Sequence, residues 1–197
     1  YSPMCYPEGG VVDDLLIYKY SEQYYLLIVN ASNTDKDFAW IRENAKGQAE
    51  VINVSDNFTQ LALQGPKAEA ILQKLTDAPL SDIGFFRFRP DVSLGGVEAI
   101  VSRTGYTGED GFELYCAADD GPLLWDLLLE AGKDFGLIPC GLGSRDTLRL
   151  EAKLPLYGHE ISDTITPLEA NLGVFVKLDK MDFCGKEALA KQQEEGI

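Results

Sequence analysis

The acidic pair Asp13-Asp14 lies inside the apolar run VVDDLLIYKY. Because side chains alternate along a strand, one of the two carboxylates shares a face with Val12, Leu16 and Tyr18, and the other points the opposite way. At least one carboxylate should therefore lie in an apolar setting, where its pKa rises and where it can handle a proton or bind a nitrogen-bearing ligand. The alternative is an edge strand that charge protects from aggregation.

Three glycines spaced by three residues, Gly105, Gly108 and Gly111, lie in the segment SRTGYTGEDGFELY. Glycine permits positive φ and close backbone approach, so the segment predicts a compact loop that leads into the strand GFELY. On that strand Gly111, Glu113 and Tyr115 share one face. A rigidly held Glu113 can accept two parallel N–H bonds from a planar, amidine-like edge. A tight hairpin with an exposed glutamate is the alternative.

Three basic residues, Arg145, Arg149 and Lys153, follow one another at i+4 spacing in GLGSRDTLRLEAK. If this segment is a helix, the like charges repel along one face, so we expect anions nearby. These anions can belong to the protein itself, such as Asp146 and Glu151. They can also be a carboxylate or carbonyl of a bound ligand, which a planar guanidinium holds well.

The composition disfavours nucleic acid and anionic membranes as partners. The formal net charge is -15 and the sequence pI is about 4.4, so phosphate groups are repelled. The sequence has no apolar run of about eighteen residues and no positively charged start with an apolar stretch, so we expect neither a membrane span nor a signal peptide. We expect a globular intracellular protein, cytoplasmic, or in the mitochondrial matrix if the source is eukaryotic. The two ends suggest a piece of a longer protein.

The cysteines are scattered and form no C-x-x-C pair: Cys5, Cys116, Cys140 and Cys184. The sequence holds a single histidine, His159. These residues argue against a metal site, and free buried thiols in a reducing compartment are expected. No serine or cysteine nucleophile motif accompanies His159, so we expect a structural or surface role for it.

The spacing of apolar residues predicts an α+β architecture of sheets and helices in layers. The first fifty-odd residues read as ββαβ, with strands at 11–20, 23–30 and 48–54 and a helix over 33–46. The remainder reads as strands at 58–65, at 111–117 and in two parts of 84–103, with helices over 66–75, 122–136 and 141–153.

Several segments, taken in order, resemble the T-protein family of the glycine cleavage system, the tetrahydrofolate-dependent aminomethyltransferases. The resemblance spans nearly the whole chain and rests on GGVVDDLLIYK, VNASNTDKDFAW, LALQGPKA, SRTGYTGEDGFELY, PCGLGSRDTLRLEAKLPLYG and DFCGKEAL.

The resemblance implies a three-domain cloverleaf around a central folate site. Two of its domains are α+β with ferredoxin-like sheets, and the third is a C-terminal β domain. By this resemblance residues 1–54 form part of the second domain and residues 55–165 part of the first. Residues 166–197 lead into a C-terminal domain that is mostly missing, and the N-terminal segment is also missing.

The resemblance also implies the reaction. Family members take the aminomethyl group on the lipoyl arm of the H-protein, pass its one-carbon unit to tetrahydrofolate and release ammonia, which gives 5,10-methylenetetrahydrofolate. Asp14 matches the key aspartate, expected to hydrogen-bond near N10 of the folate, with Asp13 as the second choice. Glu113 matches the glutamate that grips the pterin, and Arg145 matches an arginine that binds folate. The same pocket is lined at positions matching Tyr1, Leu16, Tyr18, Asn30 and Tyr106.

The chain departs from the family pattern at Ser144 and His159, where members often carry alanine and glutamine. A further ligand arginine belongs to the absent C-terminal domain, so the fragment alone should show little or no turnover. Two alternatives remain: a folate-binding accessory protein without catalysis, and a demethylating oxidase that needs a separate flavin domain. The intact pair Asp13-Asp14 favours the enzyme, because accessory relatives generally lose it.

Overall fold

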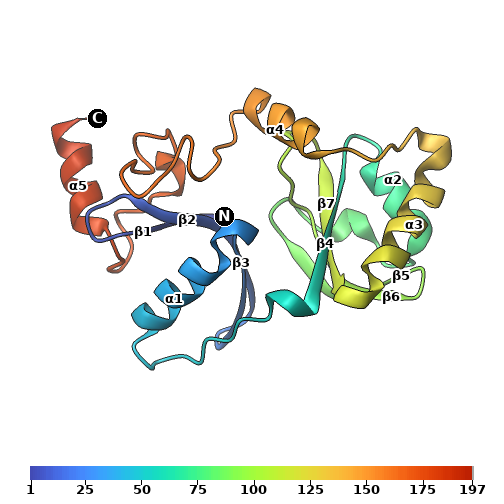
Figure 1. Ribbon diagram of the computed structural model, residues 1–197, viewed down its shortest axis with the longest axis horizontal. Coiled ribbons are helices and arrows are strands. Elements are labelled where there is room, and N and C mark those ends of the chain that lie inside the picture. The colour runs from blue at the N-terminus through green and yellow to red at the C-terminus, as the bar shows by residue number, and fades with distance from the viewer. Residues whose placement is uncertain (197) are drawn as a thin grey trace. The chain divides into compact units, whose positions relative to one another are not determined.

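The computed structural model describes residues 1–196, and the chain divides into two compact units, each with its own sheet (Figure 1). Unit 1 consists of Tyr1–Asn53 and Pro155–Ile197, and unit 2 consists of Val54–Leu154. Both sheets are antiparallel and both units contain helices, so the predicted α+β class is confirmed. Among the described residues, no helix has the length and apolar character needed to cross a bilayer.

The sheet of unit 1 has the order β1-β2-β3, with β1 at Ser2–Cys5, β2 at Val11–Ser21 and β3 at Tyr24–Ile28. The predicted hairpin of β2 and β3 is confirmed. Strand β1 pairs antiparallel along the other edge of β2, with Pro3 opposite Asp14. The acidic pair therefore lies on the middle strand of the sheet, and the alternative of a charged edge strand is wrong.

Helix α1, Thr34–Ala45, follows the hairpin as the apolar spacing predicts. It ends where Lys46 and Gly47 take left-handed φ values of 50° and 73°. The strand predicted over 48–54 is wrong, because this segment pairs with no strand and carries the chain from unit 1 into unit 2. The third strand of the sheet is β1 instead, so unit 1 begins βββα.

The second part of unit 1 packs against the start of β2. The backbone N–H of Val11 donates to the carbonyl of Ser162 over 2.7 Å. Val11 also forms an apolar cluster with Ile161 and Leu172. Helix α5, Lys186–Glu195, closes this part of the chain in the region where the sequence reads as helix-like.

The units divide the chain after residues 53 and 154, whereas the family resemblance places its divisions after residues 54 and 165. Residues 155–165 therefore group with the first unit in this structure. The assignment of the two units to domains of the family stays a prediction.

The sheet of unit 2 has the order β4-β7-β6-β5, and each neighbouring pair is antiparallel. Helices α2 and α3 lie on the same side of this sheet (Figure 1). Helix α2 starts two residues after Pro66, not at it, and α3 carries Pro122 in its first turn as expected. The regular elements confirm the predicted strands and helices: β4 Phe58–Gln64, α2 Ala68–Leu72, β5 Phe88–Leu94, β6 Val97–Ser102, β7 Gly111–Ala117, α3 Gly121–Gly132 and α4 Leu142–Glu151.

The strand alternation of β7 gives this sheet two different faces. Phe112 and Leu114 belong to the apolar core that α2 and α3 cover, together with Leu124 of α3. Glu113 and Tyr115 lie between them in the sequence and so face the other way. A buried apolar face thus fixes the strand that presents Glu113.

Short 3-10 helices connect the regular elements. Their bounds are η1 Ala31–Asn33, η2 Ser55–Asn57, η3 Gln73–Leu75, η4 Leu80–Asp82, η5 Ala118–Asp120, η6 Lys133–Phe135 and η7 Gly173–Phe175.

Candidate functional site

The two carboxylates of the acidic pair have different environments. Asp13 is completely buried, at 0% exposure, on the face of β2 that also carries the buried Val11 and Leu15. Asp14 is half-buried and lies on the opposite face with Leu16. The expectation that at least one carboxylate enters an apolar setting is confirmed, and Asp14 is the member that remains partly accessible.

A network of side-chain donors holds the pair. The amide Nδ2 of Asn30 donates to Oδ1 of Asp13 over 2.8 Å and to Oδ1 of Asp14 over 3.0 Å. The hydroxyl of Tyr1 donates to Oδ2 of Asp14 over 3.0 Å. On Asp13, Oδ1 also accepts the backbone N–H of Asp14 over 2.9 Å, and Oδ2 accepts Nδ2 of Asn33 over 3.1 Å. The structure thus brings Tyr1 and Asn30 into direct contact with Asp14.

These surroundings raise the pKa of Asp14 above its ordinary value. Burial is the largest cause, and the neighbouring charge of Asp13 adds to it. The hydrogen bonds from Tyr1 and Asn30 act in the opposite direction, because they favour the charged form. The Asp14 carboxyl is therefore a stronger proton acceptor than an exposed aspartate, yet it is held in a defined orientation.

Two further predicted pocket residues lie on the same strand as Asp14. Leu16 is partly buried and Tyr18 is buried at 5% exposure. Because they follow Asp14 at intervals of two residues, all three side chains project from one face of β2. The predicted residues of unit 1 therefore form one set on the β1-β2-β3 sheet.

A second buried carboxylate, Asp37, lies beside the pair and was missed in the sequence. It is the buried residue of α1, at 0% exposure, although the apolar spacing pointed to Phe38 and Ile41. Nζ of the preceding Lys36 donates to the carbonyl oxygen of Val12 and lies 3.6 Å from Oδ1 of Asp37. The available signal was the position of Asp37, four residues before Ile41 and therefore on the same helix face.

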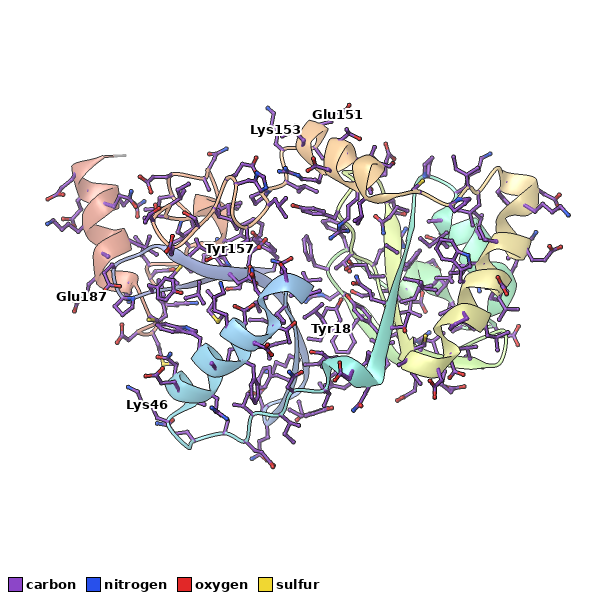
Figure 2. The ribbon with its side chains drawn as sticks, viewed as in Figure 1. Tyr18, Lys46, Glu151, Lys153, Tyr157 and Glu187 are labelled. Atoms are coloured by element: carbon purple, nitrogen blue, oxygen red, sulfur yellow. The ribbon has the colours of Figure 1, made fainter. Side chains whose placement is uncertain are left out.

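Tyr157 contacts this cluster from the second part of unit 1. The ring centroid of Tyr157 lies 4.0 Å from Nζ of Lys36, in a cation–π contact. Figure 2 labels Tyr157 beside β2, where its ring also packs against the cluster of Val11 and Ile161. Lys36 of α1 thus contacts both β2 and the segment after Pro155.

In unit 2, Glu113 is buried at 7% exposure, so the alternative of an exposed hairpin glutamate is wrong. Oε1 accepts Nε2 of Gln60 over 2.6 Å. Oε2 accepts the hydroxyls of Thr104 and Tyr115, the latter over 3.3 Å. Gln60 and Thr104 were not identified from the sequence. The position of Gln60 opposite Tyr115 in the β4-β7 ladder explains why it shares the face of Glu113.

The glycine loop surrounds the side chain of Gln64. A Cβ on Gly105 would lie 1.8 Å from Oε1 of Gln64, and a Cβ on Gly111 would lie 2.7 Å from its Cδ. Nε2 of Gln64 donates to the carbonyl oxygens of Thr104 and Phe112 over 3.1 and 3.2 Å. The predicted close backbone approach is therefore confirmed at both glycines, with the Gln64 amide as the group that needs the space.

At Gly108, the middle glycine of the loop, glycine is favoured for a different reason. Gly108 has a left-handed φ of 79°, and a Cβ there would lie 2.7 Å from the Cβ of Ala152. Both the backbone conformation and the contact with the end of α4 favour glycine at this position.

The three basic residues of the α4 segment have separate roles. Arg145 is exposed, and its guanidinium lies 4.6 Å from the ring centroid of Tyr106. Arg149 is buried and binds Oδ1 of Asp146 through Nε and Nη2, both over 2.9 Å. Lys153 lies beyond the helix end with φ of 58°, so its place on the predicted helix face is wrong (Figure 2). Arg149 thus pairs with an acidic residue of the protein itself, and Arg145 is the candidate for binding a ligand.

No acidic side chain of residues 1–196 forms an ion pair with Arg145. Together Tyr106, Glu113 and Arg145 make up a second set of predicted residues, all of them on unit 2.

The remaining sequence candidates are not part of either set. His159 is exposed, in agreement with a surface role. All four cysteines are free thiols, but only Cys5 and Cys116 are buried, so the expectation of burial is wrong for Cys140 and Cys184. Within the described part of the chain, no three His, Cys, Asp or Glu side chains form a group that could hold a metal ion.

A hollow of about 610 Å³ lies in unit 2, between residues 73–78, which follow α2, and strand β5 with the turn after it. None of the predicted site residues lines it. We therefore do not place the candidate site there.

Comparisons with known proteins give one consistent result. The family model described as the GCVT N-terminal domain matches residues 1–180. A protein of Alkaliphilus oremlandii named "Aminomethyltransferase" is 61% identical over 199 residues, and the match covers 100% of this chain and 54% of that protein. A protein of the same name from Halalkalibacterium halodurans is 60% identical over 196 residues, with the same coverage.

Among solved structures, one matches with a TM-score of 0.87 and 33% identity and is titled "Crystal structure of glycine cleavage system aminomethyltransferase T from Bartonella henselae". The match covers 100% of this chain and 53% of that chain. The chain thus spans about half the length of the curated relatives it matches.

Proposed function

The chain belongs to the GCVT N-terminal domain family, and we propose that, within a protein of its relatives' length, it forms part of the aminomethyltransferase of the glycine cleavage system. The names of the relatives at 61% and 60% identity support this activity. The proposed substrates are tetrahydrofolate and the aminomethyl-lipoyl arm of the H-protein. The proposed products are 5,10-methylenetetrahydrofolate, ammonia and the dihydrolipoyl protein.

In this reaction the carbon atom loses its bonds to nitrogen and sulfur and gains bonds to N5 and N10 of the folate. The two protons released from N5 and N10 balance the proton gained by ammonia and the proton gained by the thiol. The protein must therefore orient N10 toward the carbon and assist the departure of its proton. A carboxylate with a raised pKa suits this task, because it accepts a proton more readily than an ordinary aspartate does.

Asp14 is our choice for that group, and its environment is the observation that carries the proposal. It is half-buried, its pKa is raised, and Tyr1 and Asn30 orient its two oxygens. Asp13, the second choice, is fully buried and accepts three hydrogen bonds already. Only Asp14 of the pair is accessible enough for a direct contact with a ligand.

Glu113 is proposed to bind the pterin edge, and its present hydrogen bonds constrain how it does so. A carboxylate oxygen has two lone-pair sites. Oε1 uses one for Gln60, while Oε2 uses both, for Thr104 and Tyr115. If the pterin donates one N–H bond to each oxygen of Glu113, one of the two present donors must leave Oε2. The hydroxyl of Tyr115, with the long distance of 3.3 Å, is the one that we propose gives way.

Arg145 and Tyr106 are proposed to bind the folate as a stacked pair. The Tyr106 ring supports the planar guanidinium and leaves its N–H groups free for a carboxylate or carbonyl of the ligand. Leu16 and Tyr18 are proposed as further lining residues. The three-domain cloverleaf with ferredoxin-like sheets, and the folate site at its centre, are part of the same proposal, as is a cytoplasmic location.

The experiment uses the full-length protein with tetrahydrofolate and an aminomethylated lipoyl carrier. We expect ammonia and 5,10-methylenetetrahydrofolate to form in equal amounts, and only when both substrates are present. Folate binding without ammonia release would identify a non-catalytic accessory protein instead. The 197-residue chain alone is expected to show little or no turnover.

A further inference from the structure

The buried carboxyl group of Asp37 has no ordinary partner. Its exposure is 0%, and neither of its oxygens accepts a hydrogen bond from a donor within residues 1–196. Nζ of Lys36 lies 3.6 Å from Oδ1, which is too long for a hydrogen bond. A charged carboxylate in such a place pays a large desolvation cost, and gaining a proton removes that cost.

The group that faces Asp37 is the carboxyl of Asp13 on β2. The other groups around them are Lys36 on the same helix and Tyr157 from the segment after Pro155. Lys36 provides one positive charge for two buried carboxyls, and it also donates to the carbonyl of Val12 and contacts the Tyr157 ring. One proton on the carboxyl pair removes the remaining excess of negative charge.

Hydrogen bonding decides which carboxyl carries that proton. Asp13 accepts bonds from Asn30, from Asn33 and from the backbone N–H of Asp14, and all of these favour its charged form. Asp37 accepts none. Burial, and after it the hydrogen bond and charge of Asp13, raise the pKa of Asp37 to about 8, although Lys36 lowers it.

We propose that Asp37 is a neutral carboxylic acid in the folded protein and that its O–H donates to the carboxylate of Asp13. The bond fixes Asp13 from the side of α1. Asp13 in turn fixes Asn30, whose Nδ2 binds both members of the acidic pair. Asp37 is thereby a positioning residue for Asp14, a consequence that rests on the proposed function, whereas the shared proton does not.

The shared proton has a predictable effect on stability. Between the ordinary pKa of an aspartate, about 4, and the raised value of about 8, the folded state holds a proton that the unfolded state has lost. The contribution of Asp37 to stability is therefore complete at low pH and is lost as the pH rises through that range. One such proton changes the unfolding equilibrium constant by about tenfold per pH unit.

The test uses the full-length protein and three variants. Asp37→Asn places an amide N–H where the acid has its O–H, Asp37→Ala removes the donor, and Asp35→Asn changes an exposed carboxylate on the same helix. Denaturant unfolding is measured across this pH range. Relative to Asp37→Asn, wild type and Asp35→Asn should lose stability as the pH rises, by about tenfold per unit in the unfolding constant. Parallel curves for wild type and Asp37→Asn would overturn the proposal.

A direct readout separates this proposal from the proposed function. The 13C chemical shift of the Asp37 carboxyl carbon, assigned by its disappearance in Asp37→Asn, should be that of a neutral acid at neutral pH. The shift of a charged carboxylate would refute the shared proton whatever the activity. For the positioning role, Asp37→Ala should reduce one-carbon transfer and Asp37→Asn should restore most of it. If Asp37→Ala does not fold, Asp37→Asn is compared with wild type alone. A large loss of transfer in folded Asp37→Asn then overturns the positioning role.

Discussion

The hydroxyl of Tyr1 donates a hydrogen bond to Oδ2 of Asp14 over 3.0 Å. The antiparallel pairing of β1 with β2, which sets Pro3 opposite Asp14, brings the start of the chain to the acidic pair. This bond lowers the pKa of Asp14, against the burial that raises it. Tyr1 therefore controls how readily the carboxyl of Asp14 takes up a proton.

Replacement Tyr1→Phe should raise the pKa of Asp14 further, because it removes a donor that favours the charged form. If transfer requires the charged carboxylate, the acid limb of its pH–rate profile moves to higher pH. The profile of one-carbon transfer in the full-length protein checks this, with Tyr24→Phe, an exposed tyrosine of β3, as the control. An unchanged acid limb in Tyr1→Phe would contradict the assigned contact.

Replacement Glu113→Ala should weaken tetrahydrofolate binding by roughly tenfold to a hundredfold, the loss typical of hydrogen bonds to a charged group. Calorimetry of the full-length protein measures this. Glu98→Ala, which removes an exposed carboxylate from β6, is the matched control and should bind normally. Equal affinity in both variants removes Glu113 from the proposed pocket.

Replacement Tyr115→Phe tests the constraint on Oε2 of Glu113. It removes the long hydrogen bond that we propose is surrendered to the ligand. Folate affinity should therefore be maintained or modestly increased, since the competing donor is absent. A large loss of affinity would show that the Tyr115 hydroxyl supports binding and is not displaced.

The two arginines of α4 should separate binding from stability. Arg145→Ala should weaken folate binding and leave unfolding nearly unchanged, because the Arg145 side chain is exposed and contacts only the Tyr106 ring among the described interactions. Arg149→Ala should lower the free energy of unfolding by about 1–3 kcal/mol, because it removes buried donors to Asp146 and to the carbonyl of Leu154. Calorimetry and denaturant titration of both variants check the contrast, and similar profiles would refute it.

The glycine loop offers a test of the packing around Gln64. Gly111→Ala should destabilise the protein by about 1–3 kcal/mol, because the new Cβ would lie 2.7 Å from the Gln64 amide and from the carbonyl oxygen of Leu63. Gly143→Ala, in α4 where the new Cβ meets no atom within 4 Å apart from its own helix backbone and chain neighbours, should instead stabilise by up to about 1 kcal/mol. Denaturant unfolding compares them, and equal stability would contradict the packing.

Strand alternation predicted much of the fold and of the site. It separated the faces of Asp13 and Asp14 and placed Glu113 and Tyr115 together, because the period of a strand follows directly from its backbone geometry. It failed over 48–54, whose apolar residues read as a strand but pair with none, since pairing depends on a partner elsewhere in the fold. The grouping of residues 155–165 with unit 1 likewise depends on long-range contacts with β2.

The supporting polar residues were harder to predict than the site residues. Gln60 reaches Glu113 from the neighbouring strand, so only the β4-β7 register reveals it, and Thr104 reaches Glu113 from the loop after β6. Asp37 occupies a helix position where the apolar pattern predicts core, and its neighbour Asp13 lies on a different element. Lys153 was wrongly placed on the helix, because the i+4 spacing continues past Glu151, where α4 ends.

We propose that the carboxylate of Asp14 assists closure of the folate ring. The most direct measurement is single-turnover transfer from the aminomethylated carrier to tetrahydrofolate by full-length Asp14→Asn, with folate affinity measured on the same sample. We expect a rate reduced by about 100-fold or more, as is typical for loss of an acid–base group, with folate still bound. Transfer at the wild-type rate by Asp14→Asn would contradict it.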